Sequence, residues 1–236
     1  MYVVKLVSFD LWDTLIFDEG MEPESYTLKR LEAIWKSIPS DKKPGFNNVL
    51  EAYRVVKHVK GFIKPEDFVK AILLVLGLDI GGQVIRQAID AYEEASGSYT
   101  PRVDPDARDV LKTLKENGLK TMIVSDTSFS GTSVKKMLSN IGLSEYVDLV
   151  ITSADTGFSK PDPRIFKVGL EKLGVNPWET IHVGDSCSRD VIGALLTGLR
   201  PVLLARRIES VENCRKTGVS VISRLKELMG LIGFKL

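Results

Sequence analysis

The feature that most constrains the fold of this chain is the alternation of short apolar runs with amphipathic helical stripes. We predict strands at residues 3–9, 120–124, 149–151, 180–183 and 201–205, which are rich in β-branched side chains. Helical stripes lie between them, at residues 106–117, 132–141, 163–173 and 190–198. Mainly apolar strands joined by helices are typical of a parallel sheet that is covered on both faces. The pattern therefore predicts an α/β fold with a doubly wound parallel sheet.

A long segment without a strand pattern interrupts this alternation between residues 18 and 100. It contains helical patterns near residues 24–38, 46–59, 65–76 and 82–97, separated by ProGly, LysGly and GlyGly pairs. A connection between a strand and the next helix usually needs only about two to six residues. We therefore predict a separate helical domain at residues 18–100, inserted into a core formed by residues 1–17 and 101–236. Hinges are expected near residues 17–20 and 98–104.

The composition argues against several classes of protein. The chain has 32 basic and 31 acidic side chains spread along its length, so no basic region suggests nucleic acid as a partner. No segment reaches the roughly 20 apolar residues of a membrane span, and no leader sequence is recognisable. We therefore expect a cytoplasmic protein without a membrane partner. Two cysteines, Cys187 and Cys214, do not make a disulfide scaffold in 236 residues, so free thiols are expected.

Polar side chains that could take part in catalysis or ligand binding follow the predicted strands. Asp10 ends the first strand and Ser125 the second, Lys160 lies in a loop, and Asp185 and Asp190 follow the strand at residues 180–183. Singly, each has an ordinary explanation as a turn, cap or surface residue. Because the carboxyl ends of parallel strands lie at one edge of the sheet, however, these groups are expected to meet in one crevice.

A crevice with three carboxylates needs a cation to compensate their mutual repulsion. Carboxylate oxygens suit Mg²⁺ better than Zn²⁺, and no set of Cys and His residues has the spacing of a metal site. Mg²⁺ beside a lysine and a hydroxyl is suited to holding a phosphoryl group. A carboxylate can attack such a group and form an aspartyl-phosphate. The residues therefore favour phosphoryl chemistry on a small molecule.

These motifs resemble those of the haloacid dehalogenase superfamily, over residues 3 to about 204. The resemblance rests on SerPheAspLeuTrpAspThrLeu around Asp10, a strand-end serine, SerLysProAspPro, and ValGlyAspSerCysSerArgAspVal. It implies a Rossmann-like core with a helical cap and Asp10 as the nucleophile. It further implies that Ser125 and Lys160 bind the transferred group, and that Asp185 and Asp190 serve Mg²⁺. The expected activity is that of a phosphatase acting on a small phosphorylated metabolite.

Position 12 departs from the pattern of the family's phosphatases. They usually carry a second Asp there, as general acid and base, and this chain has Trp12. The backbone carbonyl of Trp12 could still be a metal ligand. Asp13 comes one residue too late, and we interpret it as tying the turn together rather than as a relocated acid.

Trp12 leaves two alternatives open. A 2-haloacid dehalogenase would use Asp10 as nucleophile and needs no acid, because halide leaves without a proton. Such enzymes tend to have Ser-Asn where this chain has Gly184-Asp185, and Asn in place of Asp126, which favours the phosphatase. A catalytically weak protein that binds a phosphorylated ligand is the other alternative. The sequence indicates neither the substrate nor the oligomeric state.

Overall fold

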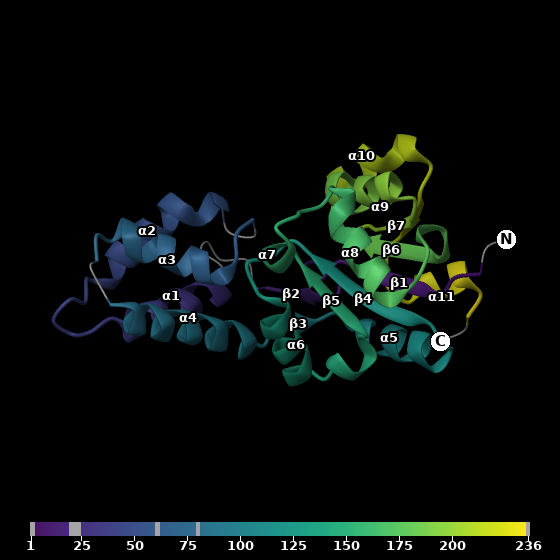
Figure 1. Cartoon of the computed structure of the whole chain (residues 1–236). Helices are drawn as coiled ribbons and strands as arrows, with labels where there is room; N and C mark the ends of the chain where they lie inside the picture. The colour runs from purple at the N-terminus through teal and green to yellow at the C-terminus, as the bar shows by residue number, and fades with distance from the viewer. Residues whose placement is uncertain (1–2, 19–24, 60–61, 79–80, 235–236) are drawn as a thin grey trace.

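The computed structural model of the chain describes residues 3–18, 25–59, 62–78 and 81–234 (Figure 1). Its centre is a sheet of six parallel strands in the order β5-β4-β1-β6-β7-β8. The strands are β1 (Leu6–Phe9), β4 (Lys120–Ser125), β5 (Leu149–Thr152), β6 (Thr180–Gly184), β7 (Arg200–Leu204) and β8 (Ser220–Ile222). The predicted doubly wound parallel sheet is confirmed, with β1 in its interior between β4 and β6.

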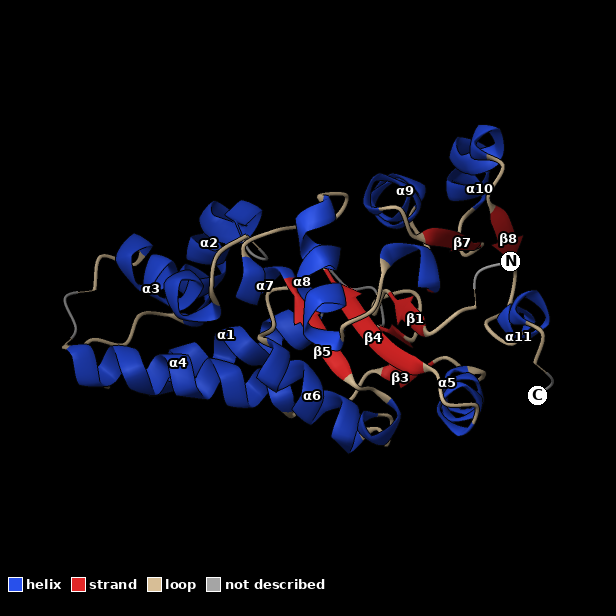
Figure 2. Ribbon diagram, turned by 45° about the vertical axis from the view of Figure 1, so that its right-hand side comes forward, coloured by secondary structure: helices blue, strands red, loops and turns tan. Residues whose placement is uncertain are grey.

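Helices cover both faces of this sheet (Figure 2). α5 (Ala107–Glu116), α6 (Gly131–Asn140) and α11 (Glu227–Ile232) contribute apolar side chains to one face. α8 (Pro163–Leu173) and α9 (Ile192–Thr197) pack on the other. Successive strand side chains point to opposite faces, so in β4 Ile123 joins the first layer while Met122 and Val124 join the second. This arrangement explains why apolar side chains of the strands point to both faces of the sheet.

Four helices form a second unit between the short strands β2 (Ile16–Phe17) and β3 (Arg102–Val103), which pair antiparallel. They are α1 (Ser25–Ser37), α2 (Phe46–Val56), α3 (Pro65–Val75) and α4 (Gly82–Gly97). Their buried side chains, which include Ile34, Val49, Phe68 and Ile72, make a separate apolar cluster. Figure 1 shows this helical unit beside the sheet rather than on one of its faces.

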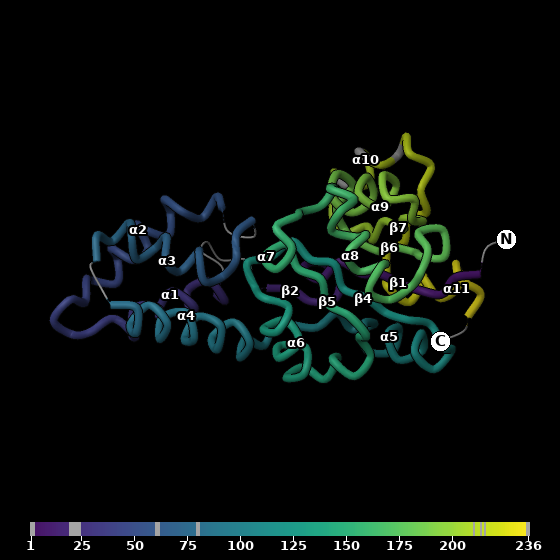
Figure 3. The backbone as a smooth tube through the Cα atoms, viewed as in Figure 1, coloured from purple at the N-terminus to yellow at the C-terminus, as the bar shows by residue number. Residues whose placement is uncertain are grey.

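The chain returns from the helical unit to the sheet unit between α4 and β3, within the segment where the second hinge is expected (Figure 3). Residues 19 and 20 of the first expected hinge lie outside the described part of the chain. The helical unit also contacts the sheet unit directly through α4 and α6, where the Glu93 carboxylate accepts hydrogen bonds from Ser130 Oγ and Ser133 Oγ, both at 2.5 Å. No helix in the described ranges is long and apolar enough to cross a membrane.

Local differences from the predicted elements have identifiable causes. Strand pairing begins at Leu6 rather than at residue 3, and Val3 is largely exposed. The expected helix at residues 190–198 is preceded by a π-helical turn, η4 (Cys187–Val191), which leads into α9. The edge strand β8 was not predicted, because two of its three residues are exposed and its apolar signal is weak.

The expectation of free thiols is wrong, because Cys187 and Cys214 form a disulfide with their Cα atoms 5.6 Å apart. Cys187 begins η4, which follows β6, and Cys214 ends α10 (Ile208–Cys214), which follows β7. Since β6 and β7 are neighbours in the sheet, the segments after their carboxyl ends lie side by side. A count of cysteines carries no information on this juxtaposition.

Candidate active site

Three neighbouring strands bring the predicted polar residues together at the carboxyl edge of the sheet. Asp10 follows β1, Ser125 is the last residue of β4, and Asp185 follows β6. The register places Phe9 beside both Ile123 and Val183, so the three chains leave the sheet at nearly the same level. The sequence prediction that these strand ends share one crevice agrees with this geometry.

Lys160 holds two of the carboxylates. Its Nζ donates to Asp10 Oδ1 at 2.5 Å and to Asp190 Oδ1 at 2.6 Å, and all three side chains are buried. Thr14 Oγ1 donates to the other oxygen of Asp10 at 3.2 Å. The ammonium group is therefore fixed directly beside the carboxylate that ends the first strand.

Asp190 is held on both of its oxygens. Oδ1 contacts His182 Nε2 at 3.3 Å in addition to Lys160, and Oδ2 accepts from the Ser186 backbone N–H at 2.9 Å. Gly184 makes the approach possible, since a Cβ atom there would lie 2.2 Å from Asp190 Cγ. A serine at position 184, the dehalogenase-like residue, does not fit this arrangement. Asp190 is thus fixed in position while it contacts Lys160.

His182, in the middle of β6, also contacts residues of the site. Its Nδ1 contacts Ser8 Oγ at 3.0 Å, and its ring packs edge-on against Phe166. The imidazole therefore lies in the core and supports Asp190 through the contact of its Nε2 with Asp190 Oδ1. The sequence signal for this role is the alternation in β6, which points His182 and Gly184 to the same side.

Two buried polar atoms at this edge lack a protein partner within the described part of the chain. They are Ser125 Oγ and Asp185 Oδ1. Buried polar groups are nearly always hydrogen-bonded, and leaving one unpaired is costly. Their position beside Asp10 identifies them as the atoms of the site that are available to a ligand.

The cluster carries more negative than positive charge. Oxygens of Asp10, Asp185 and Asp190 lie within 4.8 Å of one another. Burial, together with the charges of Asp10 and Asp190, raises the pKa of Asp185 to about 6. Burial also raises the pKa of Asp10, against the opposing effect of Lys160. For Asp190, Lys160 and His182 outweigh the cost of burial and lower its pKa. Asp185 is the carboxylate that most lacks a positive neighbour.

Trp12 forms an apolar wall at the position where an acid is usual. Its ring stacks on Tyr26 of α1 with centroids 4.9 Å apart and lies 5.7 Å from Phe129. Asp13 has a φ of 59° and pairs with Arg207 at 2.7 Å, on the exposed side of the turn. Asp13 does not line the cavity described next, in agreement with the interpretation that it ties the turn together.

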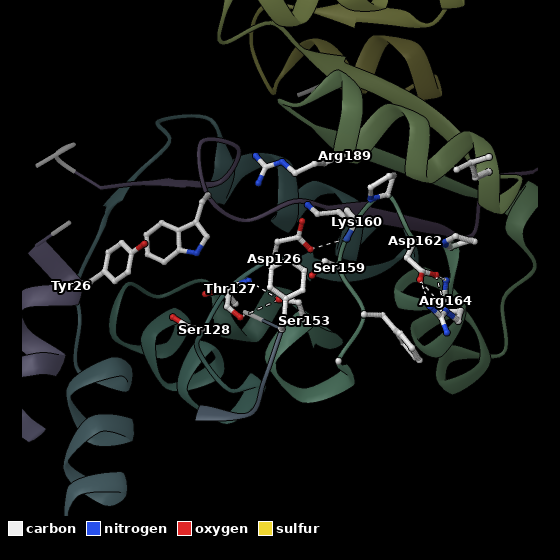
Figure 4. A pocket seen from close by; sticks show the side chains of 17 residues that line it. Tyr26, Asp126, Thr127, Ser128, Ser153, Ser159, Lys160, Asp162, Arg164 and Arg189 are labelled. Atoms are coloured by element: carbon white, nitrogen blue, oxygen red, sulfur yellow. Dashed lines mark hydrogen bonds and ion pairs between the residues drawn. The ribbon is translucent and has the colours of Figure 1, made fainter. Parts of the chain in front are cut away.

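A cavity of about 920 Å³ is lined in part by Lys160, the residue whose ammonium group contacts the buried Asp10 and Asp190 (Figure 4). Aromatic side chains line one part of it, and these include Trp12, Tyr26, Phe62 and Phe158. The polar lining includes Asp126, Arg189, Asp162 and Arg164, of which the sequence analysis singled out only Asp126, and only as a difference from dehalogenases. Helical-unit residues such as Tyr26 and Phe62 thus share the cavity with the sheet unit.

The parallel sheet, with buried carboxylates and a lysine at its carboxyl edge, agrees with a match to a known family of hydrolases. Residues 4–196 match the family described as haloacid dehalogenase-like hydrolase, and the chain belongs to this family.

Curated relatives and solved structures agree with this assignment. The chain is 30% identical over 209 residues to a glyceraldehyde 3-phosphate phosphatase of Methanopyrus kandleri, covering 86% of this chain and 85% of the relative. A relative with the same name from Pyrococcus furiosus is 30% identical over 202 residues, covering 84% and 80%. The crystal structure of a HAD phosphatase from Thermococcus onnurineus superposes with a TM-score of 0.64 at 26% identity, covering 98% of this chain and 99% of that chain. A 2-haloacid dehalogenase from Pseudomonas syringae shares the fold, with a TM-score of 0.67 at 18% identity and coverage of 98% and 99%.

Proposed function

We propose that this protein is a magnesium-dependent phosphatase that hydrolyses a small phosphorylated metabolite, with Asp10 as the nucleophile. The observation that carries the proposal is the buried arrangement of Asp10 against Lys160, next to the unpaired Ser125 Oγ and Asp185 Oδ1. Relatives that are 30% identical over most of the chain are named as glyceraldehyde 3-phosphate phosphatases, which supports a phosphate ester as the substrate.

Each residue of the cluster has a distinct task in such a reaction. The Asp10 carboxylate attacks phosphorus and forms an aspartyl-phosphate. Lys160 and the hydroxyl of Ser125 bind the oxygens of the transferred phosphoryl group, whose charge is spread over all of them. Asp190, fixed by His182 and Ser186, holds the ammonium group of Lys160 in place. The low exposure of the cluster keeps bulk water away from these charges.

The carboxylates fit a divalent cation. Among the lysines and arginines that the structure describes, only Lys160 pairs with these carboxylates, so two of their three negative charges remain uncompensated. Asp185, with an unpaired oxygen, and Asp10 are the carboxylates best placed to hold Mg²⁺, with the Trp12 carbonyl as a further ligand. Asp190 is the third candidate ligand, because one of its oxygens lies within 4.8 Å of oxygens of Asp10 and Asp185, although Lys160, His182 and Ser186 also contact it. When bound, Mg²⁺ would neutralise charge on the phosphoryl oxygens.

The helical unit is proposed to act as a cap that selects the substrate. Tyr26 and Phe62 come from this unit and line the cavity opposite Lys160 and Asp126. The dehalogenase alternative loses support because Gly184 leaves no space for a side chain and because, without Mg²⁺, a carboxylate substrate would enter an already negative site.

The decisive experiment is phosphate release with Mg²⁺ and with EDTA, for the parent protein and for Asp10→Asn. Suitable substrates are p-nitrophenyl phosphate, glyceraldehyde 3-phosphate and other small sugar phosphates, with 2-chloropropionate as the dehalogenase substrate. We expect Mg²⁺-dependent release by the parent and none by Asp10→Asn, which should remain folded in a thermal melt. Halide release in EDTA, or full activity of Asp10→Asn, would contradict the proposal. Ligand-induced stabilisation without phosphate release would instead support the binding-only alternative.

A further inference from the structure

An alkyl phosphate needs a proton for its leaving oxygen, and the site as described so far has no donor for it. Trp12 offers no titratable group, and Asp13 is paired with Arg207. The proton must therefore come from another side chain that faces the cavity. Among the described residues that line this cavity, two have a carboxyl group, Asp126 and Asp162.

Asp162 is committed elsewhere. Its carboxylate caps the N-terminus of α8 by accepting from Arg164 N at 2.9 Å, and both of its oxygens accept from the Arg164 guanidinium. Hydrogen bonds from the side chain and backbone of Arg164 lower the pKa of Asp162. A carboxylate held in this way remains ionised and has no proton to give.

The Asp126 carboxyl group is held by a backbone N–H rather than by an arginine side chain. Asp126 directly follows Ser125, so its backbone is anchored at the end of β4, beside the hydroxyl assigned to phosphoryl binding. Oδ1 accepts from the backbone N–H of Lys160 at 2.9 Å, which fixes the orientation of the carboxyl group, and Asp126 lines the cavity. Figure 4 shows Asp126 among the lining side chains, next to Lys160. Asp126 is thus held by the same loop that supplies the catalytic lysine.

The geometry points to Asp126 as the general acid and base of the reaction, in place of the acid missing at position 12. This inference rests on the proposed phosphatase function. In the first half-reaction Asp10 attacks phosphorus, the bond from phosphorus to the leaving oxygen breaks with its electron pair on that oxygen, and this oxygen takes the proton of Asp126. In the second, the Asp126 carboxylate takes a proton from water, whose oxygen attacks phosphorus and expels the Asp10 carboxylate. An alcohol and inorganic phosphate leave, and Asp126 is protonated again.

The charges around Asp126 are compatible with both protonation states. Burial raises its pKa, while Lys160 and Arg189 oppose the rise and Asp190 adds to it. A group that must donate in one half-reaction and accept in the next works best when neither form is strongly favoured. The neighbouring cations also stabilise the carboxylate that remains after donation.

Asp126→Asn tests the role without removing the structural contact, because the amide oxygen can still accept from Lys160 N. The substrates form a series from p-nitrophenyl phosphate, whose leaving group needs no proton, to alkyl phosphates, whose leaving group does. We expect Asp126→Asn to lose about 10²–10⁴-fold in turnover of alkyl phosphates. With p-nitrophenyl phosphate it should release a burst of p-nitrophenolate equal to the enzyme concentration, followed by slow turnover, because the water that hydrolyses the aspartyl-phosphate is no longer activated.

Two further variants make the result unambiguous. Asp162→Asn replaces the other carboxyl group of the cavity and should keep the parent's ratio of alkyl to aryl turnover. Asp126→Glu restores an acid and should recover part of the alkyl activity lost in Asp126→Asn. Parental turnover of alkyl phosphates by Asp126→Asn, or an equal loss on both substrates without a burst, would overturn the inference while the phosphatase function stands. A parent that releases no phosphate from any ester would instead remove the proposed function itself.

Discussion

Asp185 and Asp190 belong to the same carboxylate cluster, yet replacement of each by asparagine is expected to change the stability of the metal-free protein in opposite directions. Asp185 is buried, has an unpaired oxygen, and is repelled by Asp10 and Asp190. Asp190 accepts from Lys160 Nζ at 2.6 Å and is further held by His182 and Ser186. Neutralising the first relieves repulsion, whereas neutralising the second weakens a buried ion pair.

The magnitude for Asp185 follows from its pKa, which rises from 3.8 to about 6 on folding. Each unit corresponds to about 1.4 kcal/mol, so the charged form of Asp185 lowers the free energy of unfolding by about 3 kcal/mol. Because the folded state binds this proton more tightly than the unfolded state, stability falls as the pH rises from about 4 through about 6. Above about pH 6 the ionised Asp185 lowers the free energy of unfolding by the full amount, and below about pH 4 it no longer does so.

Asp185→Asn should therefore stabilise the metal-free protein by up to about 3 kcal/mol at pH 7.5 and have little effect near pH 4. Asp190→Asn should destabilise it by about 3–5 kcal/mol at pH 7.5, as is typical when one partner of a buried ion pair is removed. The measurement is urea unfolding in EDTA at both pH values, followed by circular dichroism. Added Mg²⁺ should stabilise the parent but not Asp185→Asn. Equal destabilisation by both variants, or a pH-independent effect of Asp185→Asn, would refute the reasoning.

Two further predictions concern the loop that carries these carboxylates. Gly184→Ala places a Cβ atom 2.2 Å from Asp190 Cγ, so Asp190 must move away from Lys160. Steady-state kinetics should show that kcat falls at least about tenfold, while the variant still unfolds cooperatively. Removal of the disulfide by Cys214→Ser should lower the free energy of unfolding by about 3–4 kcal/mol, because the bond closes a loop over 27 positions and so restricts the unfolded chain. Dithiothreitol should lower the melting temperature of the parent but not that of the variant.

Most of the sheet and its helices could be predicted because their signals are local. β4 contains the apolar run Met122–Val124, β6 contains the β-branched residues Ile181 and Val183, and α8 follows Asp162 with Pro163 and ends before Gly174, so each element carries its own signals. β8 and the short β2–β3 pair lack such a pattern, since they depend on pairing with distant segments. The disulfide depends likewise on the order of strands in the sheet.

The positions of Asp10, Ser125 and Asp185 could be predicted because a parallel sheet places all of its strand ends on one edge. The sequence could not show which of their oxygens are already satisfied. That Asp190 is held by His182 and Ser186 while Asp185 keeps an unpaired oxygen follows from side-chain geometry alone. From the sequence alone, the two aspartates are therefore expected to have the same role.

The stack of Trp12 on Tyr26 has an optical consequence. Trp12 belongs to the sheet unit and Tyr26 to the helical unit, so their contact spans the boundary between the two. Movement of α1 away from β1 would expose the indole to water and shift its fluorescence to longer wavelength. The chain has three tryptophans; Trp35 packs inside the helical unit, and Trp178 is 48% exposed, lies two residues before β6 and does not line the cavity. With these two replaced by phenylalanine, the emission of Trp12 alone would report whether the helical unit and the sheet separate while a ligand binds.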